Sequence, residues 1–419
     1  MAIVRLALQS VWNRQVTAGL TVLAVALSAA MLLGVEKVRR DARSAFADTI
    51  SSTDLIVGAR GGPVQLLLYS VFRIGDPTND ISWESYQHIE GLPEVSWTVP
   101  ISLGDSHRGY RVMGTTQDYF EHYRYARRER LRFAAGAPFE EVFDAVLGAE
   151  VAKRLGYALG DPIEVAHGAG TVSMLTHEDK PFRVVGILEP TGTPVDRTVH
   201  LSLEGIEAMH VDWRAGVPIP ALRVSPQEAE EMHLEPDAVT AVLVGLDSRV
   251  AVLRVQRYVN QYRGEPLQAI IPGVTLQQLW DMMSVAENAL RGISIMVVVT
   301  GMLGMLTVIL SSLEARRREM AVLRSVGARP LHVWGLFMSE AGALALFGVG
   351  LGITLFYALL AVARPFAARE FGLHLPVAPP GPWDLAILGF VVLAGFVAGC
   401  VPAIRAYRLS LSDGLSMRI

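Results

Sequence analysis

The fold is decided by the stretch Glu314-Ala-Arg-Arg-Arg-Glu-Met-Ala-Val-Leu-Arg-Ser-Val-Gly-Ala-Arg-Pro330, which joins two apolar runs of membrane-spanning length. Arginine-rich connections between spans stay on the cytoplasmic side of a membrane. Met320 and Leu323 are three residues apart and would share one apolar stripe of a helix with charged flanks. Gly327 is suited to end such a helix, and Pro330 cannot continue it. The stretch therefore predicts an amphipathic cytoplasmic helix between two spans.

This helix has the features of a docking element. Its apolar stripe can insert into a groove on a cytoplasmic partner while its arginines pair with an acidic rim. The alternative is an interfacial helix whose arginines only anchor lipid headgroups and fix the topology. Within segment 314–330, the residues that we expect to couple the chain to a partner are Arg316, Arg317, Arg318, Glu319, Met320, Leu323, Arg324 and Gly327.

Composition agrees with a chain that is partly embedded in a membrane. Of the 419 residues, 51% are hydrophobic and 19% are charged, which is too apolar for an ordinary soluble protein and too polar for a chain made only of spans. About 20 apolar residues cover the ~30 Å hydrocarbon core. Four runs reach that length, at residues 16–35, 291–313, 331–363 and 383–404. The first is longer than the apolar part of a secretory signal, so we interpret it as a retained anchor.

The arginines also predict the orientation of the chain. Those of segment 314–330 and of the tail 405–419 mark two cytoplasmic segments. Both termini are then cytoplasmic, and the short loop 364–382 and the long region 36–290 are periplasmic. Residues 1–15 carry apolar and polar stripes at four-residue spacing, which predicts an amphipathic helix on the inner membrane surface. The expected location is the bacterial inner membrane.

One charge pattern opposes this orientation. The residues that follow the first span on its predicted outer side include Lys37, Arg39, Arg40 and Arg43. Long translocated regions obey the charge rule poorly, and nearby acidic residues such as Glu36 partly offset the positive charge. We therefore keep the predicted orientation.

Region 36–290 predicts a soluble domain of mixed α/β type. Helices are expected at Trp83–Ile89 and Val250–Tyr262, and strands at Val95–Val99, Tyr110–Gly114, Ala221–Val224 and Val239–Val244. Asp80 and Ser82 are candidate caps for the first helix. From about 111 to 215, glycines and prolines divide the chain into short strands and turns. The pattern indicates an α/β body whose two halves are separated by a β-rich insertion.

Glu340 lies about ten residues into the third apolar run. An ionisable group at membrane depth is costly, and it is usually functional or paired inside a helix bundle. The alternative is that this segment enters the membrane late and that Glu340 lies in the headgroup layer. The sequence leaves both interpretations open.

Glycines at four-residue spacing predict close packing of the last two spans. Gly348 and Gly352 form one such pair, and Gly395 and Gly399 form another. Small residues let helix backbones approach each other in lipid. We expect this packing within one subunit, with a contact between subunits as the alternative.

Several chemical functions have no support in the sequence. Eight of the ten histidines lie in region 36–290, but they form no His-Glu-x-x-His motif and there are no paired cysteines, so we predict no metal site. The single cysteine, Cys400, lies in an apolar run and is expected to have a packing role. No Gly-x-Ser-x-Gly motif indicates a nucleophile. A net charge of −4 gives no reason to expect a nucleic-acid partner.

Motifs along most of the chain resemble one family of membrane proteins. The relevant runs are Val112-Met-Gly-Thr-Thr-Gln-Asp-Tyr-Phe120, Gly136-Ala-Pro-Phe139, Val146-Leu-Gly-Ala-Glu-Val-Ala-Lys-Arg-Leu155, Leu159-Gly-Asp-Pro-Ile163 and Phe182-Arg-Val-Val-Gly-Ile187. They resemble the outer domain of the macrolide-exporter (MacB) type of ABC transporter permease. The run 318–328 with Glu340, and Val401-Pro-Ala-Ile-Arg-Ala-Tyr-Arg408, resemble the membrane half that this type shares with lipoprotein-releasing permeases and cell-division FtsX proteins.

The resemblance implies a four-span subunit that dimerises and transmits ATP-driven closure across the membrane. Its outer domain would have a porter-like part and a β-rich part. The implied partners are a cytoplasmic ABC ATPase subunit, a second permease copy and the lipid membrane, with a periplasmic adaptor or binding protein as a further candidate. The chain departs from the family pattern at residues 60–72, for which we can place no counterpart.

A second departure concerns nucleotide binding. No Gly-x-x-x-x-Gly-Lys-Ser/Thr sequence occurs in the chain, so the loop that cradles nucleotide phosphates is missing. We expect that this chain is not an enzyme and binds no cofactor, and that ATP is bound by a separate subunit.

Three functions remain open at this point. The first is export of a lipoprotein, peptide, hydrophobic compound or metal-linked ligand, driven by a separate ATPase. The second is regulation of a periplasmic enzyme by an FtsX-type transducer, without transport. The third is a membrane-anchored receptor with no ATPase partner. The large outer region favours the first over the second, and the predicted docking helix argues against the third.

Overall fold

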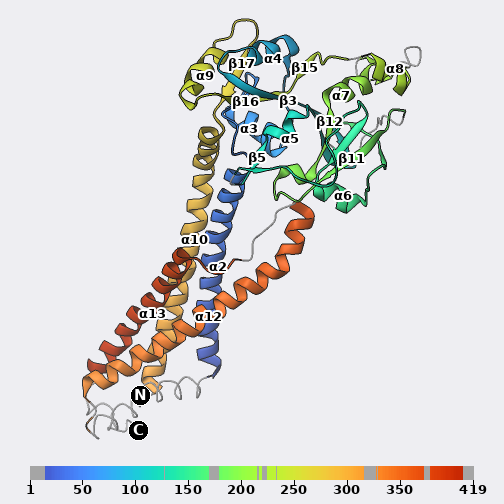
Figure 1. Cartoon of the computed structure of the whole chain (residues 1–419). Helices are drawn as coiled ribbons and strands as arrows, with labels where there is room; N and C mark the ends of the chain where they lie inside the picture. The colour runs from blue at the N-terminus through green and yellow to red at the C-terminus, as the bar shows by residue number, and fades with distance from the viewer. Residues whose placement is uncertain are drawn as a thin grey trace. The chain divides into compact units, whose positions relative to one another are not determined.

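The chain forms two compact units (Figure 1). The computed structural model describes residues 15–126, 128–168, 179–214, 217–218, 224–232, 234–315, 327, 329–371 and 378–408. We name Arg43–Met282 the strand-bearing unit, and Met1–Ala42 together with Met283–Ile419 the helical unit. Both unit boundaries fall inside helices, namely α2 (Gln15–Asp48) and α10 (Pro272–Ala315). The boundaries expected from the sequence were 36 and 290.

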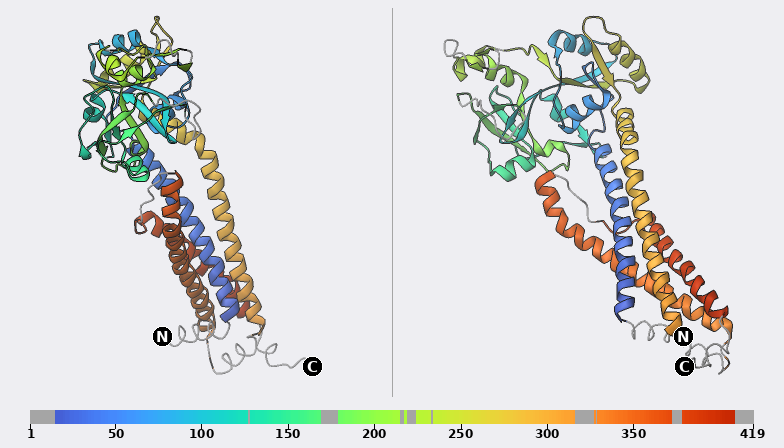
Figure 2. Two further views of the ribbon diagram at one scale, coloured as in Figure 1. Left: turned by 90° about the vertical axis from the view of Figure 1, so that its right-hand side faces the viewer. Right: turned by 180° about the vertical axis from the view of Figure 1, so that it is seen from behind.

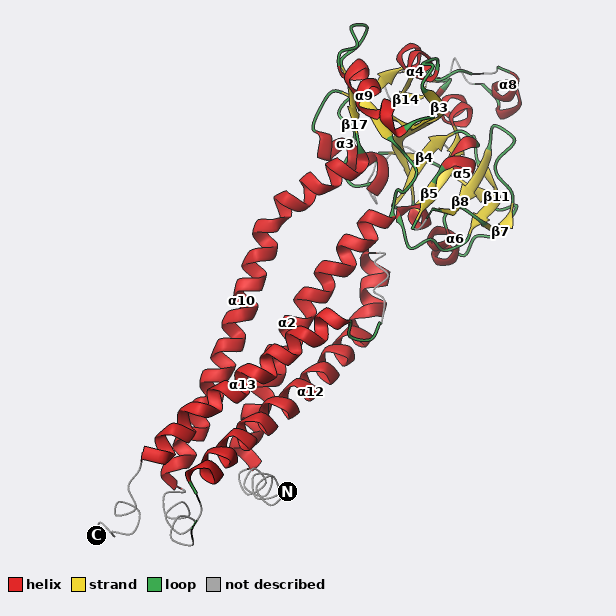
Figure 3. Cartoon of the chain, turned by 60° about the vertical axis from the view of Figure 1, so that its left-hand side comes forward, coloured by secondary structure: helices red, strands yellow, loops and turns green. Residues whose placement is uncertain are grey.

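One large sheet organises the strand-bearing unit (Figure 3). Its main path among the described residues runs β17 (Leu267–Ile270), β1 (Leu55–Ala59), β16 (Ala241–Leu246), β3 (Val95–His107), β4 (Tyr110–Thr115), β12 (Thr198–Ser202), β8 (Asp144–Leu147), β11 (Phe182–Leu188) and β7 (Phe133–Gly136). Off this path, β10 (Ala166–His167) pairs with β3, and β9 (Pro162–Ile163) pairs with β11. Three further pairs are β13 (Trp213–Arg214) with β14 (Val217–Pro218), β15 (Ala238–Val239) with β2 (Ile81–Ser82), and β5 (Arg124–Tyr125) with β6 (Glu129–Arg130).

Short helices cover this sheet. They are α3 (Pro63–Phe72), α4 (Trp83–Glu90), α5 (Asp118–His122), α6 (Ala149–Leu155), α7 (Leu203–His210), α8 (Pro226–Glu231) and α9 (Val252–Asn260), with 3₁₀ turns η1 (Pro194–Arg197) and η3 (Arg249–Ala251). Residues 60–72, for which we could place no counterpart in the family that the sequence resembles, contain α3.

Strand β1 shows why consecutive apolar residues form a strand here. Ile56 packs into one hydrophobic cluster with α3, whereas Leu55 and Val57 pack into another with α4 and α9. Successive side chains of a strand point to opposite faces of a sheet, so a strand that is covered on both faces is apolar throughout.

Residues from about 111 to 215 extend the same sheet. They contribute β4, β7, β8, β11 and β12 together with α5, α6 and α7. A separate hydrophobic cluster fills the space under α6 and α7, and it includes Val112, Leu147, Val151, Phe182 and Ile206. This part therefore has its own core, although its strands are hydrogen-bonded to the rest of the sheet.

Local sequence signals located several elements correctly. The predicted helix at Trp83–Ile89 is α4, and the Ser82 hydroxyl caps it by accepting a hydrogen bond from the Ser85 amide at 3.3 Å. The strands predicted at Val95 and Tyr110 are β3 and β4. The strand predicted at Val239 corresponds to two successive strands, β15 and β16. The helix predicted at Val250–Tyr262 is η3 followed by α9. The strand predicted at Ala221–Val224 lies mostly outside the described residues.

The helical unit contains α12 (Pro330–Phe371), α13 (Pro382–Arg408) and parts of α2 and α10 (Figure 2). Four segments of the described helices are long and apolar enough to cross a membrane: Gln15–Lys37, Pro272–Ser311, Trp334–Phe366 and Pro382–Arg405. The four predicted spans are thus confirmed as apolar helices. Their exposed apolar side chains are suited to contact lipid.

Glycines bring these helices close together, as predicted. A Cβ atom on Gly352 would lie 2.7 Å from the carbonyl oxygen of Ala26 in α2, and one on Gly348 would lie 2.6 Å from the Val25 Cβ. In α13, Cβ atoms on Gly395 and Gly399 would meet alanine methyl groups of α12 at 2.5 and 2.7 Å. Both pairs therefore serve packing within one chain.

Candidate functional site

The predicted docking segment lies largely outside the described residues. This applies to Arg316, Arg317, Arg318, Glu319, Met320, Leu323 and Arg324, whose coupling role stays a prediction. Gly327 is described, is exposed and has a φ of +96°, a conformation that glycine adopts readily. The segment is bounded by α10, which ends at Ala315, and α12, which begins at Pro330. Pro330 thus starts the next helix, where proline is well tolerated.

Glu340 is buried inside the helical unit. It lies in α12, within the candidate span Trp334–Phe366, and is 5% exposed. Phe337, almost one helical turn before Glu340, and the adjacent Ala341 both belong to a buried apolar cluster. This burial fits the interpretation of a carboxyl group held inside the bundle better than that of a group in the headgroup layer.

An ion-pair network joins three helices of the helical unit. Arg39 of α2 contacts Glu36 at 2.6 Å and Glu287 of α10 at 3.8 Å. Arg40 pairs with Asp384 near the start of α13. Arg291 of α10 reaches Glu36 at 3.7 Å. We name these six residues the arginine network.

The arginine network accounts for the charge pattern that opposed the predicted orientation. Arg39 and Arg40 are not unbalanced charges after the first span, because acidic side chains from three helices surround them. Glu36 is only 8% exposed and lies within 4 Å of three arginines. Such pairing offsets the cost of removing charge from water.

The sequence analysis missed the distant members of this network. Asp384 follows Pro382-Trp383 at the start of a span, and its carboxylate accepts a hydrogen bond from the Gly381 amide at 2.9 Å. Glu287 precedes the predicted second span by about one helical turn, and Arg291 is the first residue of that span. The sequence did contain a signal for this network. Acidic residues occur at the predicted outer ends of two spans, and a cluster of arginines occurs at the outer end of a third.

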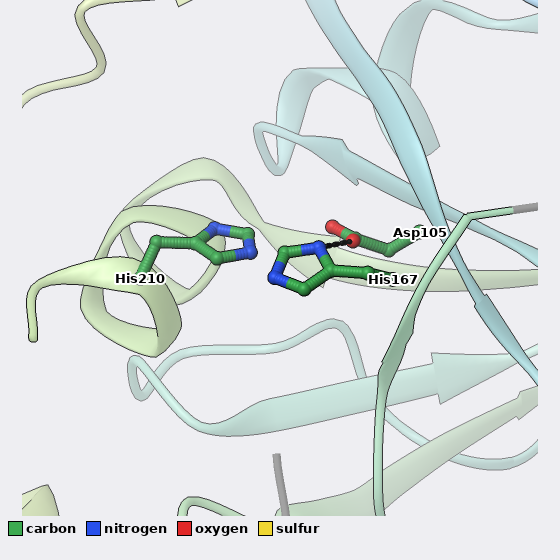
Figure 4. A group of neighbouring side chains, drawn as sticks. All are labelled: Asp105, His167 and His210. Atoms are coloured by element: carbon green, nitrogen blue, oxygen red, sulfur yellow. Dashed lines mark hydrogen bonds and ion pairs between the residues drawn. The ribbon is translucent and has the colours of Figure 1, made fainter. Parts of the chain in front are cut away.

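Histidines in the strand-bearing unit have different environments. His88 contacts the Tyr258 hydroxyl at 2.9 Å, and His122 stacks on Trp97. His200 is completely buried, and this burial, together with the charge of Arg73, lowers its pKa to about 3. His167 and His210 stack on each other beside Asp105 (Figure 4). The sequence analysis did not foresee this last group.

A mixed α/β domain and four helices long and apolar enough to cross a membrane are the architecture of a membrane protein with a domain outside the bilayer. Two family models match the chain: the MacB-like periplasmic core domain over residues 18–262, and the FtsX-like permease C-terminal over residues 291–411. The chain belongs to the family of ABC transporter permeases that carry these two parts. The resemblance and the fold class expected from the sequence are therefore confirmed.

Two of the relatives with curated names are longer than this chain. The macrolide export ATP-binding/permease protein MacB of Nitrosomonas europaea is 22% identical, with 99% of this chain and 59% of the relative aligned. MacB of Nitrobacter winogradskyi is 26% identical, with 65% of this chain and 38% of the relative aligned. Among solved structures, the periplasmic region of MacB from Actinobacillus actinomycetemcomitans aligns with 55% of this chain and 94% of its own at 11% identity and a TM-score of 0.35.

Proposed function

We propose that this chain is the permease subunit of an ABC transporter in the bacterial inner membrane. It couples ATP hydrolysis by a separate cytoplasmic ATPase to motion of its periplasmic domain, and so expels a lipoprotein, peptide, hydrophobic compound or metal-linked ligand. The observation that carries the proposal is the unbroken helix α10. It runs from Pro272, next to β17, to Ala315, where the predicted docking segment begins.

The length of α10 suits a mechanical role. With 44 residues and a rise of about 1.5 Å per residue, the helix is about 66 Å long, which is roughly twice the ~30 Å hydrocarbon core. Helix α2, with 34 residues, also continues beyond membrane length. The arginine network ties these two helices to each other and to α13. A displacement of segment 314–330 would therefore move several helices together.

The motif content of this sequence supports the proposal of a separate subunit for nucleotide binding. The named relatives are ATP-binding/permease proteins, and the chain spans 38% and 59% of their length. The 419 residues contain no phosphate-binding Gly-x-x-x-x-Gly-Lys-Ser/Thr motif. We therefore assign ATP hydrolysis to a partner, and expect two permease copies to receive it.

Co-purification tests the coupling. The full chain is co-expressed with the candidate ABC ATPase from the same operon, and the complex is isolated in detergent. The double variant Arg316→Glu/Leu323→Asp should lose the ATPase, because it reverses one charge and interrupts the apolar stripe. Leu253→Asp/Arg254→Glu makes the same chemical changes on exposed positions of α9 and should keep it. Unchanged association of the first variant would contradict the docking role.

A deletion strain tests the transport step. Accumulation of a lipoprotein, peptide or hydrophobic compound on the inner-membrane side, reversed by the wild-type gene, supports export. Unchanged cargo distribution with loss of a periplasmic enzyme activity would instead indicate a regulatory transducer of FtsX type.

A further inference from the structure

Three side chains with metal-binding atoms meet in the strand-bearing unit (Figure 4). They are Asp105 of β3, His167 of β10 and His210 at the end of α7. The Asp105 Oδ1 and His167 Nδ1 atoms are 3.0 Å apart, and the two imidazole rings stack with centroids 4.7 Å apart. One ligand atom from each residue can be chosen so that all three lie within 4.8 Å of one another.

The fold fixes the positions of these residues from three sides. Strands β10 and β3 are antiparallel, and their register places His167 directly opposite Asp105. Helix α7 is capped by Ser202 and anchored in the core by Ile206 and Met209, so its last residue, His210, has a defined place. The convergence therefore follows from sheet pairing and helix packing.

Neighbouring groups hold the cluster in place. Trp213 contacts the His167 ring edge to face, with centroids 4.8 Å apart. Beside it, the Lys180 ammonium donates a 2.6 Å hydrogen bond to the Asp212 carboxylate, and both side chains are buried. A packed aromatic ring and a buried ion pair restrict the movement of the segment that follows His210.

We propose that Asp105, His167 and His210 bind one divalent transition-metal ion, for which Zn²⁺ is the best chemical match. Two imidazoles and one carboxylate form a common donor set for zinc and other first-row metals, whereas Mg²⁺ and Ca²⁺ prefer oxygen donors. Ligand atoms about 2.1 Å from a tetrahedral zinc ion are about 3.4 Å apart. The separations of up to 4.8 Å thus close by side-chain adjustments of about 1 Å.

The proposed site would leave a coordination position of the metal open and would let the metal ion exchange with solvent. The three donors found among the described residues leave at least one coordination position for water or for a donor group of a ligand. The side chain of Asp105 is 9% exposed and that of His167 is 31% exposed, so a metal ion can reach the cluster from solvent. A closed structural zinc site would have four protein ligands. The inference stands on these three residues and does not depend on the proposed transport function.

Metal titration of the full chain in detergent tests the proposal. The protein carries an affinity tag without histidines, is treated with EDTA and is then titrated with Zn²⁺ against a chromophoric chelator. We expect one Zn²⁺ per chain, no competition from excess Mg²⁺, and a rise in the unfolding temperature with Zn²⁺. Co²⁺ should report nitrogen and oxygen ligands through its visible absorption. No binding of Zn²⁺ or Co²⁺ would overturn the proposal.

Variants identify the ligands. His167→Gln and His210→Gln should each weaken Zn²⁺ binding by at least about 100-fold. Asp105→Asn removes the third proposed ligand and should weaken binding by more than about 100-fold. A loss of only about 10 to 100-fold would instead mean that the carboxylate orients His167 without binding the metal. His122→Gln is the matched control, because the half-buried His122 lies in a separate group with the exposed Asp118 and Glu121.

Folding is checked for every variant by its unfolding temperature without metal, and the second histidine variant replaces the first if one fails to fold. Retained Zn²⁺ affinity in both histidine variants, or loss of Zn²⁺ binding in His122→Gln, would contradict the assignment.

Discussion

Both units of this protein bury large side chains, including Phe182 in the strand-bearing unit and Phe337 in the helical unit, but they differ in how their elements approach one another. The strand-bearing unit encloses large residues such as Tyr119, Phe182 and Leu55. The contacts of the helical unit depend on small ones, including Ala26, Ala29 and Ala345 against glycines of neighbouring helices. Water drives apolar area into a core in the first case. Lipid provides no such drive, so helices in a membrane gain stability by close approach.

The units also differ in where they keep charge. Within its described residues, the strand-bearing unit buries the complete ion pair of Lys180 with Asp212. The helical unit gathers the arginine network near one end of its apolar segments. Substitutions in the two units should therefore change stability by different amounts, and four of them test this difference.

Loss of the buried ion pair should have the largest effect. Lys180→Met leaves the Asp212 carboxylate buried without its cation, which should lower the free energy of unfolding by about 3 to 5 kcal/mol. Denaturant unfolding of the full chain, followed through the strand-bearing unit, measures this change. The double variant Lys180→Met/Asp212→Leu should recover most of the stability, because no lone charge remains. Equal losses in the single and double variants would contradict this account.

Overpacking between spans should have the next largest effect. Gly352→Leu drives a side chain into the Ala26 backbone and should cost about 1 to 3 kcal/mol or more. Gly350→Leu is the matched control on the same helix, since a Cβ atom there meets no other atom within 4 Å. Unfolding temperature and the fraction of monodisperse protein in detergent report the difference. Similar losses for both variants would show that α12 does not pack through this face.

Removal of a charge from the arginine network should have a smaller effect. Arg40→Gln leaves Asp384, whose side chain is 3% exposed, without its cation and should cost about 1 to 3 kcal/mol. Arg254→Gln breaks an exposed pair with Glu94 in the strand-bearing unit and should cost at most about 1 kcal/mol. Thermal unfolding of the full chain compares the two. An equal effect would mean that Arg40 is as well solvated as Arg254.

Acid should destabilise the strand-bearing unit slightly through His200. Because its pKa is about 3 in the folded chain and about 6.5 when unfolded, the unfolded chain takes up a proton first as the pH falls. Stability is complete above pH 6.5 and declines toward pH 3, by about 1 kcal/mol between pH 6.5 and 5.5. Unfolding measured at several pH values should show a weaker acid dependence for His200→Phe.

This comparison is best made in a Glu207→Gln background. Burial raises the pKa of Glu207 to about 7, so this carboxyl group stabilises the fold below pH 4.5 and loses that contribution as the pH rises through 7. Its effect opposes that of His200. An unchanged acid dependence in His200→Phe would show that another group is responsible.

Local patterns made much of the fold predictable. The four spans follow from apolar length, and the contacts of Gly348 and Gly399 follow from spacing along a helix. Helix α4 follows from Ser82 and the pattern after it. Each of these signals lies within one element, where the geometry of a helix or strand decides which residues share a face.

The arginine network and the cluster of Asp105, His167 and His210 could not be predicted in this way. Asp105 and His167 are 62 residues apart and meet only because the two-residue strand β10, too short to show a period, pairs with β3. Arg40 and Asp384 are separated by 344 residues. Long-range pairing leaves no trace in a single sequence beyond the residue types themselves, and the predicted coupling residues from Arg316 to Arg324 lie outside the described part of the chain.

Strands β1 and β17 give the strand-bearing unit a particular response to force. Ile56 lies opposite Ile270 and Ala59 opposite Leu267, so the start of β1 and the end of β17 are at the same end of the pair. Helix α2 precedes the first strand, and α10 follows the second. Opposed pulls on the two helices would open this strand pair like a zipper, one hydrogen bond at a time, whereas a common pull would leave it unloaded. The strand pair would then stay intact when α2 and α10 move together, and it would separate first when the two helices move in opposite directions.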